Sequence, residues 1–227
     1  MYGVTANTIA VIIGSAIGLV FKKYIPKNSG DVIMKALGLC VVVIGISGAL
    51  KGENTLILII SIVVGTVLGT LLKLDDRLNN FANNVQKKFS TKNSQDNSFS
   101  QGFVSATLLF CVGAMAVVGS LQAGLSGDNQ MLYTKSMLDG ISSIVFASAF
   151  GIGTIFAAVP VFIYQGAITL LSHFVAPVLS DACINEMTCT GSVLIMGIGF
   201  NMLGITKLKI MDLLPAVFIP VVIFLSI

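Results

Sequence analysis

The sequence predicts an all-α polytopic membrane protein with about eight transmembrane helices. Three observations lead to this prediction: the apolar content, the length of the apolar runs and the distribution of positive charge. Apolar residues make up 55% of the 227 residues, charged residues make up 10%, and the mean hydropathy is +0.95. Soluble domains carry about 25% charged residues. The apolar runs are roughly 17 to 22 residues long, which fits membrane helices and argues against the shorter alternating strands of a barrel.

Eight apolar segments follow one another along the chain. Their expected ranges are 3–21, 32–50, 56–72, 102–121, 136–156, 159–179, 190–205 and 211–227. No Lys or Arg precedes the first segment, so we expect it to stay in the protein with its N-terminus outside. The expected organisation is helices one to three over 1–72, a cytoplasmic segment over 73–101 and helices four to eight over 102–227.

Positive charges divide unequally between the two sides of this arrangement. With both termini outside, two basic residues, Lys51 and Lys135, lie on the outer side, and eleven lie on the cytoplasmic side. The eleven are Lys22, Lys23, Lys27, Lys35, Lys73, Arg77, Lys87, Lys88, Lys92, Lys207 and Lys209. Cytoplasmic loops of membrane proteins are enriched in Lys and Arg. The distribution therefore supports an even number of helices with both termini outside.

The long polar stretch over 73–101 separates the two groups of helices. Five apolar residues recur there at spacings of 4, 3, 4 and 4, which places them on one face of a helix. They are Leu74, Leu78, Phe81, Val85 and Phe89. We expect an amphipathic helix on the inner leaflet, with a soluble extension of the third helix as the alternative. The polar sequence over 90–100 predicts a flexible linker.

Short similar motifs indicate an internal repeat. GSAIG at 14–18 matches ASAFG at 147–151, and TVLG at 66–69 matches NMLG at 201–204. All the offsets lie between 133 and 136 residues, with Gly30 over Gly166 as a further match. The pattern predicts two parallel four-helix repeats, the second starting near residue 135, related by an axis along the membrane normal. Small residues are common in membrane helices, so chance similarity is the alternative.

Few polar side chains fall inside the apolar segments, and an ionisable one there indicates a functional site. Asp139, expected in the first turn of the fifth helix, is the centre of the predicted site. The candidates for lining a path for a small cation or zwitterionic solute are Asp139, Asn7, Gln165, Asn201, Ser142, Ser143 and Thr8. Structural alternatives are that Asp139 caps its helix by accepting from the N–H groups of Ser142 or Ser143, and that Asn201 makes an interhelical hydrogen bond.

The single histidine and two of the four cysteines complete the set of candidate residues. His173 is either a proton relay or a hydrogen-bonded packing residue. Cys183 and Cys189 flank a short polar loop and form either a disulfide or two free thiols. No group of residues has metal-site spacing, and no P-loop, HExxH or Ser/His/Asp pattern occurs. We therefore expect neither an enzyme nor a resident metal or cofactor, and no nucleic-acid partner.

Five stretches of the sequence carry a family resemblance. They are NTIAVIIGSAIGL at 7–19, ALGLCVVVIGISGAL at 36–50, TLLFCVGAMAVVGSLQAGLSGD at 107–128, YTKSMLDGISSIVFAS at 133–148 and YQGAITLL at 164–171. Together they resemble the YdfK/YqgA-like family of bacterial inner-membrane proteins, whose function is unknown. The resemblance implies a multi-pass protein of the bacterial cytoplasmic membrane and brings no established site residues.

From these observations we expect a secondary transporter or ion-conducting membrane protein for a small cation or zwitterionic solute. We expect it to be surrounded by lipid and to form a homodimer, since 227 residues give little bulk around a central path. The alternative is a non-transporting membrane scaffold or partner subunit. A transporter needs polar groups that converge between helices, whereas a scaffold does not.

Overall fold

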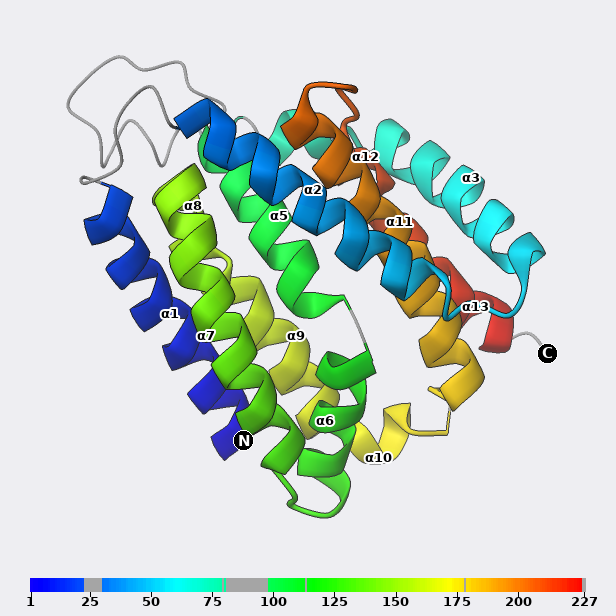
Figure 1. Ribbon diagram of the computed structural model, residues 1–227. Helices are drawn as coiled ribbons and strands as arrows, with labels where there is room; N and C mark the ends of the chain where they lie inside the picture. Colours follow the sequence, from blue (N-terminus) through cyan, green and yellow to red (C-terminus); the bar gives the residue numbers. More distant parts are fainter. Residues whose placement is uncertain (23–29, 79, 81–97, 113, 178, 226–227) are drawn as a thin grey trace.

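The computed structural model describes residues 1–22, 30–78, 80, 98–112, 114–177 and 179–225. Over these residues the chain is helical and contains no strand, which confirms the all-α prediction (Figure 1). The longer helices are α1 (Tyr2–Lys22), α2 (Gly30–Ala49), α3 (Thr55–Leu71), α5 (Ser98–Cys111), α6 (Ala114–Leu125), α7 (Gln130–Phe150), α9 (Ala158–Leu170) and α11 (Asp181–Leu203). The shorter elements are α8 (Gly153–Phe156), α10 (Ser172–Val175), α12 (Ile210–Leu213), the 3₁₀ helix η2 (Leu214–Phe218) and α13 (Ile219–Leu225).

Several helix boundaries differ from those expected from hydropathy. The fifth helix, α7, begins at Gln130 rather than at residue 136, and it ends where Gly151 adopts a φ of 86°. The expected loop over 180–189 is instead the first part of α11. In both cases some of the polar residues in the added part of the helix are buried: Lys135 in α7, and Glu186 and Thr188 in α11. A hydropathy pattern cannot register this kind of burial.

Four of the expected spans are interrupted: the fifth between α7 and α8, the sixth between α9 and α10, and also the fourth and the eighth. The fourth divides into α5 and α6, which are bent by 56° relative to each other. The eighth divides into α12, η2 and α13, with Pro215 in the first turn of η2 and Pro220 at the start of α13. Proline has no N–H to donate to the preceding turn, so prolines so close together disfavour one continuous α-helix.

Helices α1 and α7 lie side by side and run in the same direction (Figure 1). Gly3 lies against Leu132, Gly14 against the carbonyl group of Gly140, and Gly18 against Ile144 and Ala147. A Cβ at Gly14 would collide with the Gly140 carbonyl oxygen. The absence of a side chain there lets the two backbones approach closely, as in other membrane helix pairs with small residues at the contact.

Helix α11 is packed in the middle of the molecule and runs antiparallel to α2. Gly38 of α2 lies against Met202, and Gly48 lies against Ser192. The turn between α2 and α3 is attached to α11 by Glu186, whose Oε1 accepts hydrogen bonds from the N–H groups of Glu53 and Asn54 at 2.7 and 2.8 Å. Helix α11 therefore holds α2 and the turn that leads to α3.

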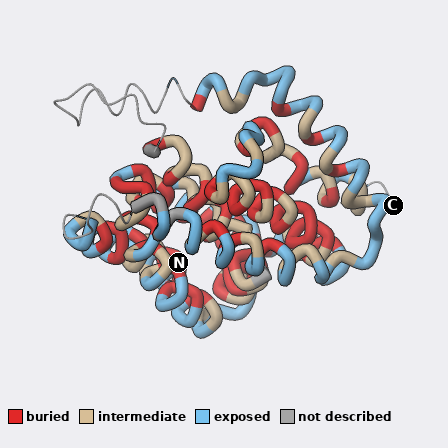
Figure 2. Tube along the Cα trace, turned by 45° about the horizontal axis from the view of Figure 1, so that its top comes forward, coloured by how far each residue is buried: buried red, intermediate tan, exposed pale blue. Residues whose placement is uncertain are grey.

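Buried residues gather in the middle of the molecule, and exposed residues line the outward faces of the helices (Figure 2). Many of these outward residues are large and apolar, as expected for a surface in contact with lipid. Within the described part of the chain, three helical stretches are long and apolar enough to cross a bilayer: Tyr2–Lys22, Gly153–Leu170 and Asp181–Leu203. The bent pair of α5 and α6 can count as a fourth.

Part of the predicted amphipathic segment is also described. Residues 74–78 are helical, Leu74 is half-buried and Leu78 is buried. Leu78 therefore packs against the protein, and the turn at Lys73, with a φ of 51°, separates this segment from α3. The remaining predicted positions, Phe81, Val85 and Phe89, and the linker over 90–97 lie outside the described residues.

Candidate functional site

Four polar side chains from α1, α7 and α9 meet in the interior, and we call them the Asp139 cluster: Asn7, Lys135, Asp139 and Gln165. The Lys135 ammonium lies 2.9 Å from Oδ1 and 2.8 Å from Oδ2 of Asp139. The amide nitrogen of Asn7 donates to Asp139 Oδ2 at 3.0 Å and to Gln165 Oε1 at 3.2 Å. Helix α1 is distant in sequence from α7 and α9 but packs against both of them.

The orientation of both amides follows from the hydrogen-bonding pattern. An ionised carboxylate only accepts hydrogen bonds, so the Asn7 group that faces Asp139 must be its NH₂. This NH₂ has two hydrogens, and the second is given to Gln165, which must therefore present its oxygen. The Asp139 charge thus determines the direction of the hydrogen bonds across three helices.

All four side chains are inaccessible or nearly so: Asn7 and Gln165 are 0% exposed, and Lys135 and Asp139 are each 6% exposed. Two of their polar atoms, Asn7 Oδ1 and Gln165 Nε2, have no hydrogen-bond partner among the described residues. A buried polar group without a partner costs about 1–3 kcal/mol. The cluster therefore offers one free acceptor and one free donor beside a paired positive and negative charge.

The cluster lies well inside the helices. Asp139 is the tenth of the 21 residues of α7, about 14 Å from the start of the helix at a rise of 1.5 Å per residue. The prediction that it sits in the first turn is therefore wrong, because α7 begins earlier than hydropathy suggests. Asp139 does not cap its helix. Its carboxylate is instead held by Lys135, one turn earlier on the same face.

Three of the other predicted candidates bond within their own helices or have no recorded bond. Ser143 is buried and donates to the carbonyl oxygen of Asp139 at 2.6 Å. Thr8 is half-buried and donates to the carbonyl oxygen of Val4 at 2.9 Å. Ser142 is half-buried, and no hydrogen bond of its side chain is recorded within the described residues. The structure therefore places these three beside the Asp139 cluster rather than in its hydrogen-bonding network.

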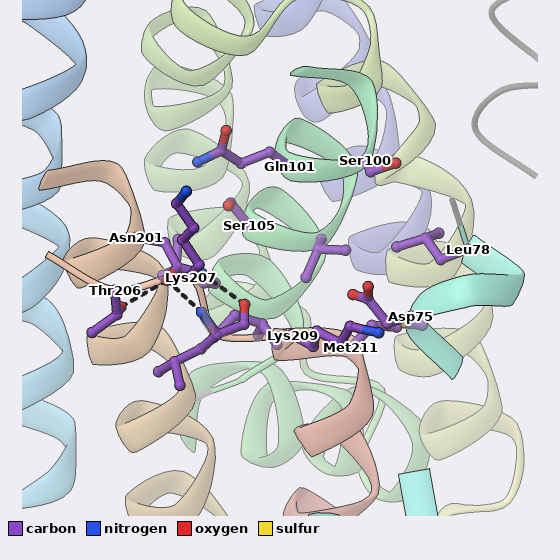
Figure 3. Close-up of a pocket in the computed structure, with 14 residues that line it drawn as sticks. Asp75, Leu78, Ser100, Gln101, Ser105, Asn201, Thr206, Lys207, Lys209 and Met211 are labelled. Atoms are coloured by element: carbon purple, nitrogen blue, oxygen red, sulfur yellow. Dashed lines mark hydrogen bonds between the residues drawn. The ribbon is translucent and has the colours of Figure 1, made fainter. Parts of the chain in front are cut away.

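Asn201 lies apart from the Asp139 cluster, in the last turn of α11. Its amide donates to the carbonyl oxygen of Leu208 at 2.8 Å and accepts from Thr206 Oγ1 and from the N–H of Leu208 at 2.7 and 2.8 Å. It also lines a separate pocket (Figure 3). Asn201 therefore holds the turn after α11, and its expected place beside Asp139 is wrong, because α11 packs against α2 rather than against α7.

The structure also places His173 and the two cysteines. His173 is exposed on α10, so it is not a buried packing residue, and no bond joins it to the Asp139 cluster within the described residues. Cys183 and Cys189 are free and buried, which corrects the disulfide alternative. Both lie in the continuous helix α11, roughly 9 Å apart along its axis, beyond the reach of a disulfide.

Sequence reasoning missed Lys135, which it assigned to an outer loop. A Lys four residues before a buried Asp is the available signal, because the two share one helix face. Glu186 and Asp212 were also missed as buried carboxylates. Glu186 accepts hydrogen bonds from the backbone N–H groups of Glu53 and Asn54 in the turn between α2 and α3. Asp212 Oδ1 accepts one from the N–H of Asp75 at 2.9 Å. Both carboxylates therefore bind segments that follow α2 and α3 to the C-terminal helices.

Comparison with known proteins supports the membrane assignment. YdfK of Bacillus subtilis (strain 168), described as an uncharacterized membrane protein, is 39% identical over 229 residues, which cover 99% of this chain and 96% of YdfK. YqgA of Escherichia coli (strain K12), described as an uncharacterized protein, is 26% identical over 118 residues, which cover 52% of this chain and 50% of YqgA. No solved structure matches this chain.

These similarities confirm the resemblance found in the sequence. They extend over nearly the whole chain in YdfK, so they include α1, α7 and α9. The family model of proteins of unknown function, DUF554, matches residues 2–225. The chain therefore belongs to the DUF554 family and is similar to a bacterial membrane protein.

Proposed function

We propose that this protein is a secondary transporter or ion-conducting membrane protein for a small cation or a zwitterionic solute. The observation that supports the proposal is the convergence of Lys135, Asp139, Asn7 and Gln165 between three helices, with one acceptor and one donor left without partners. Ionisable side chains inside a membrane are costly and usually belong to substrate or ion pathways. A scaffold has no need of such a group.

The ion pair changes which solutes suit the cluster. Asp139 alone would favour a cation, but Lys135 already neutralises its charge at 2.8 Å. A cation, or a proton, must therefore compete with the Lys135 ammonium for the carboxylate. A zwitterionic solute can instead place its cationic group at Asp139 and Asn7 Oδ1, and its anionic group at Lys135 and Gln165 Nε2.

The proposal includes a chain that crosses the bilayer eight times with both termini outside. The parallel contact of α1 with α7 and the antiparallel contact of α2 with α11 agree with the directions that eight alternating passes require. The excess of Lys and Arg on the proposed cytoplasmic side supports the same orientation. The close pairing of α1 and α7 also agrees with a repeat that relates the first helix of each half.

The test is a thermal-shift screen of the purified protein against monovalent cations and amino acids. A solute that binds the folded state raises its melting temperature by mass action. The cluster is inactivated by the double substitution Lys135→Gln/Asp139→Asn, which leaves no unpaired charge. Asp181→Asn, an exposed carboxylate at the start of α11, is the matched control.

We expect a shift with at least one solute, lost in the double variant and kept in Asp181→Asn. The same solute, in labelled form, should enter proteoliposomes that contain the wild type, and it should not enter those that contain the double variant. If no solute shifts the melting temperature and none is taken up, the transport proposal fails and the scaffold alternative stands.

A further inference from the structure

A second polar site lies away from the Asp139 cluster, at the end of the bundle that carries most of the basic residues. It is a pocket of about 360 Å³ between α5, the end of α11, the turn before α12 and the helical residues 75–78 (Figure 3). Ligand sites in proteins range from about 300 to 1,000 Å³. The pocket is therefore large enough for a small organic ligand.

The charged side chains that line this pocket favour an anion. Two lysines, Lys207 and Lys209, and one aspartate, Asp75, line the pocket, and Asp75 has interactions of its own with neighbouring groups. Lys209 lies 3.4 Å from Asp76 on the surface, where both side chains are about 60% exposed, so this pair is weak. No hydrogen bond or ion pair of Lys207 is recorded within the described residues, so its ammonium is available.

Neutral hydrogen-bond donors lie on the Lys207 side of the pocket. Figure 3 shows the Lys207 side chain extending on the same side as Gln101 and Ser105, whereas Lys209 extends towards Asp75. Ser105 is 2% exposed, so its hydroxyl group lies at the base of the pocket rather than at its rim. An ammonium beside an amide and a hydroxyl group suits a ligand with several acceptor oxygens.

The position of Lys207 is determined by a rigid turn. Asn201 makes three hydrogen bonds to the residues on either side of Lys207, with Thr206 and Leu208 as partners. Gly204, with a φ of 76°, ends α11 in the left-handed conformation that allows this turn. The backbone of Lys207 is thus held in place before any ligand binds, which lowers the entropy lost on binding.

We propose that this pocket binds a phosphate group that is attached to a small organic moiety. The Lys207 ammonium, with the Gln101 amide and the Ser105 hydroxyl on the same side of the pocket, supplies a charged donor and neutral donors for the several oxygens of a phosphate. The volume leaves room for a substituent beyond the phosphate itself. The proposal uses none of the residues of the Asp139 cluster and does not depend on transport.

A phosphate of this kind can come from two sources. One is a soluble phosphomonoester, and the other is the glycerophosphate headgroup of an anionic lipid. Basic pockets at the cytoplasmic side of membrane helices are known to hold anionic headgroups. The chemistry of the site is the same for both, so the experiment has to separate them.

The experiment uses the purified full-length protein at low ionic strength. In the first arm, inorganic phosphate and glycerol 3-phosphate are titrated against protein in detergent, with sodium chloride at matched ionic strength as the reference. In the second arm, melting temperatures are compared between nanodiscs of phosphatidylcholine alone and nanodiscs that also contain phosphatidylglycerol. Both arms are repeated with Lys207→Gln, with Gln101→Glu and with the control Lys73→Gln, an exposed lysine near the pocket that does not line it.

We expect glycerol 3-phosphate, phosphatidylglycerol or both to bind the wild type. Lys207→Gln should weaken binding at least tenfold, Gln101→Glu should abolish it by charge repulsion, and Lys73→Gln should change it by less than twofold. A response in the first arm identifies a soluble ligand, and a response in the second arm alone identifies a lipid. The proposal is overturned if neither arm responds, or if Lys73→Gln weakens binding as much as Lys207→Gln.

Discussion

At the scale of single residues, the Lys135–Asp139 pair decides the character of the interior. Each of the two charges is acceptable there because the other lies within 2.9 Å and because Asn7 donates to the same carboxylate. Removing one partner leaves an uncompensated buried charge, which is far more costly than replacing both by apolar groups. The stability of the protein should therefore depend on the pair as a unit.

This dependence predicts a double-mutant result. Lys135→Met and Asp139→Leu should each lower the free energy of unfolding by about 3–5 kcal/mol, and the double substitution should recover most of that loss. Chemical unfolding of the purified proteins in detergent measures all three values. If the two single losses simply add in the double variant, the pair does not act as a unit.

The cysteines give a second prediction at this scale. Cys183 and Cys189 are free in the structure, and the Cys189 thiol donates to the carbonyl oxygen of Ala49 at 3.1 Å. Alkylation of the denatured, unreduced protein should therefore modify all four cysteines. The mass of the alkylated protein measures how many were modified. A species two modifications short would show that a disulfide had formed.

At the scale of helices, the parallel contact of α1 with α7 creates the Asp139 cluster. Without it Asn7 could not reach Asp139, because 132 residues separate the two in sequence. The contact depends on Gly14, where a Cβ would meet the backbone of Gly140. The reverse position is more tolerant, since a Cβ at Gly140 would lie 3.4 Å from the Ala10 Cβ, an ordinary contact.

A matched pair of substitutions tests this contact. Gly14→Ala should lower stability by about 1–3 kcal/mol, the usual cost of overpacking, and should weaken any solute response of the Asp139 cluster. Gly140→Ala adds the same methyl group to the facing helix and should have a much smaller effect. Melting temperatures of both variants in detergent provide the measurement, and equal losses would contradict the close approach at Gly14.

At the scale of the whole molecule, the arrangement of helices predicts which loops lie on the same side of the membrane. Asp128, in the turn before α7, and Lys73, after α3, are expected on opposite sides, with Asp128 outside. In a background in which all four cysteines are replaced by alanine, an impermeant maleimide should label Asp128→Cys in intact cells. Lys73→Cys should be labelled only after the cells have been permeabilised. The opposite pattern would invert the proposed orientation.

The sequence by itself determined the class of the protein, its family and three members of the Asp139 cluster. Long apolar runs and few charges are enough for the class, because they reflect the low polarity of the lipid around the chain. Asp139, Asn7 and Gln165 were identified because polar groups inside apolar segments are rare.

The tertiary structure decided which polar residues meet and which are merely buried. Lys135 looked like a loop residue, and Asn201 looked like a neighbour of Asp139, because hydropathy reports the average environment of a segment and not the partner of each side chain. The start of α7 at Gln130 brings Lys135 into the same helix as Asp139, and the pairing of α1 with α7 brings Asn7 to the same carboxylate. The pairing of α2 with α11 keeps Asn201 away from α7. The contact of Asn7 with Asp139, between residues distant in sequence, depends on packing, which no local pattern records.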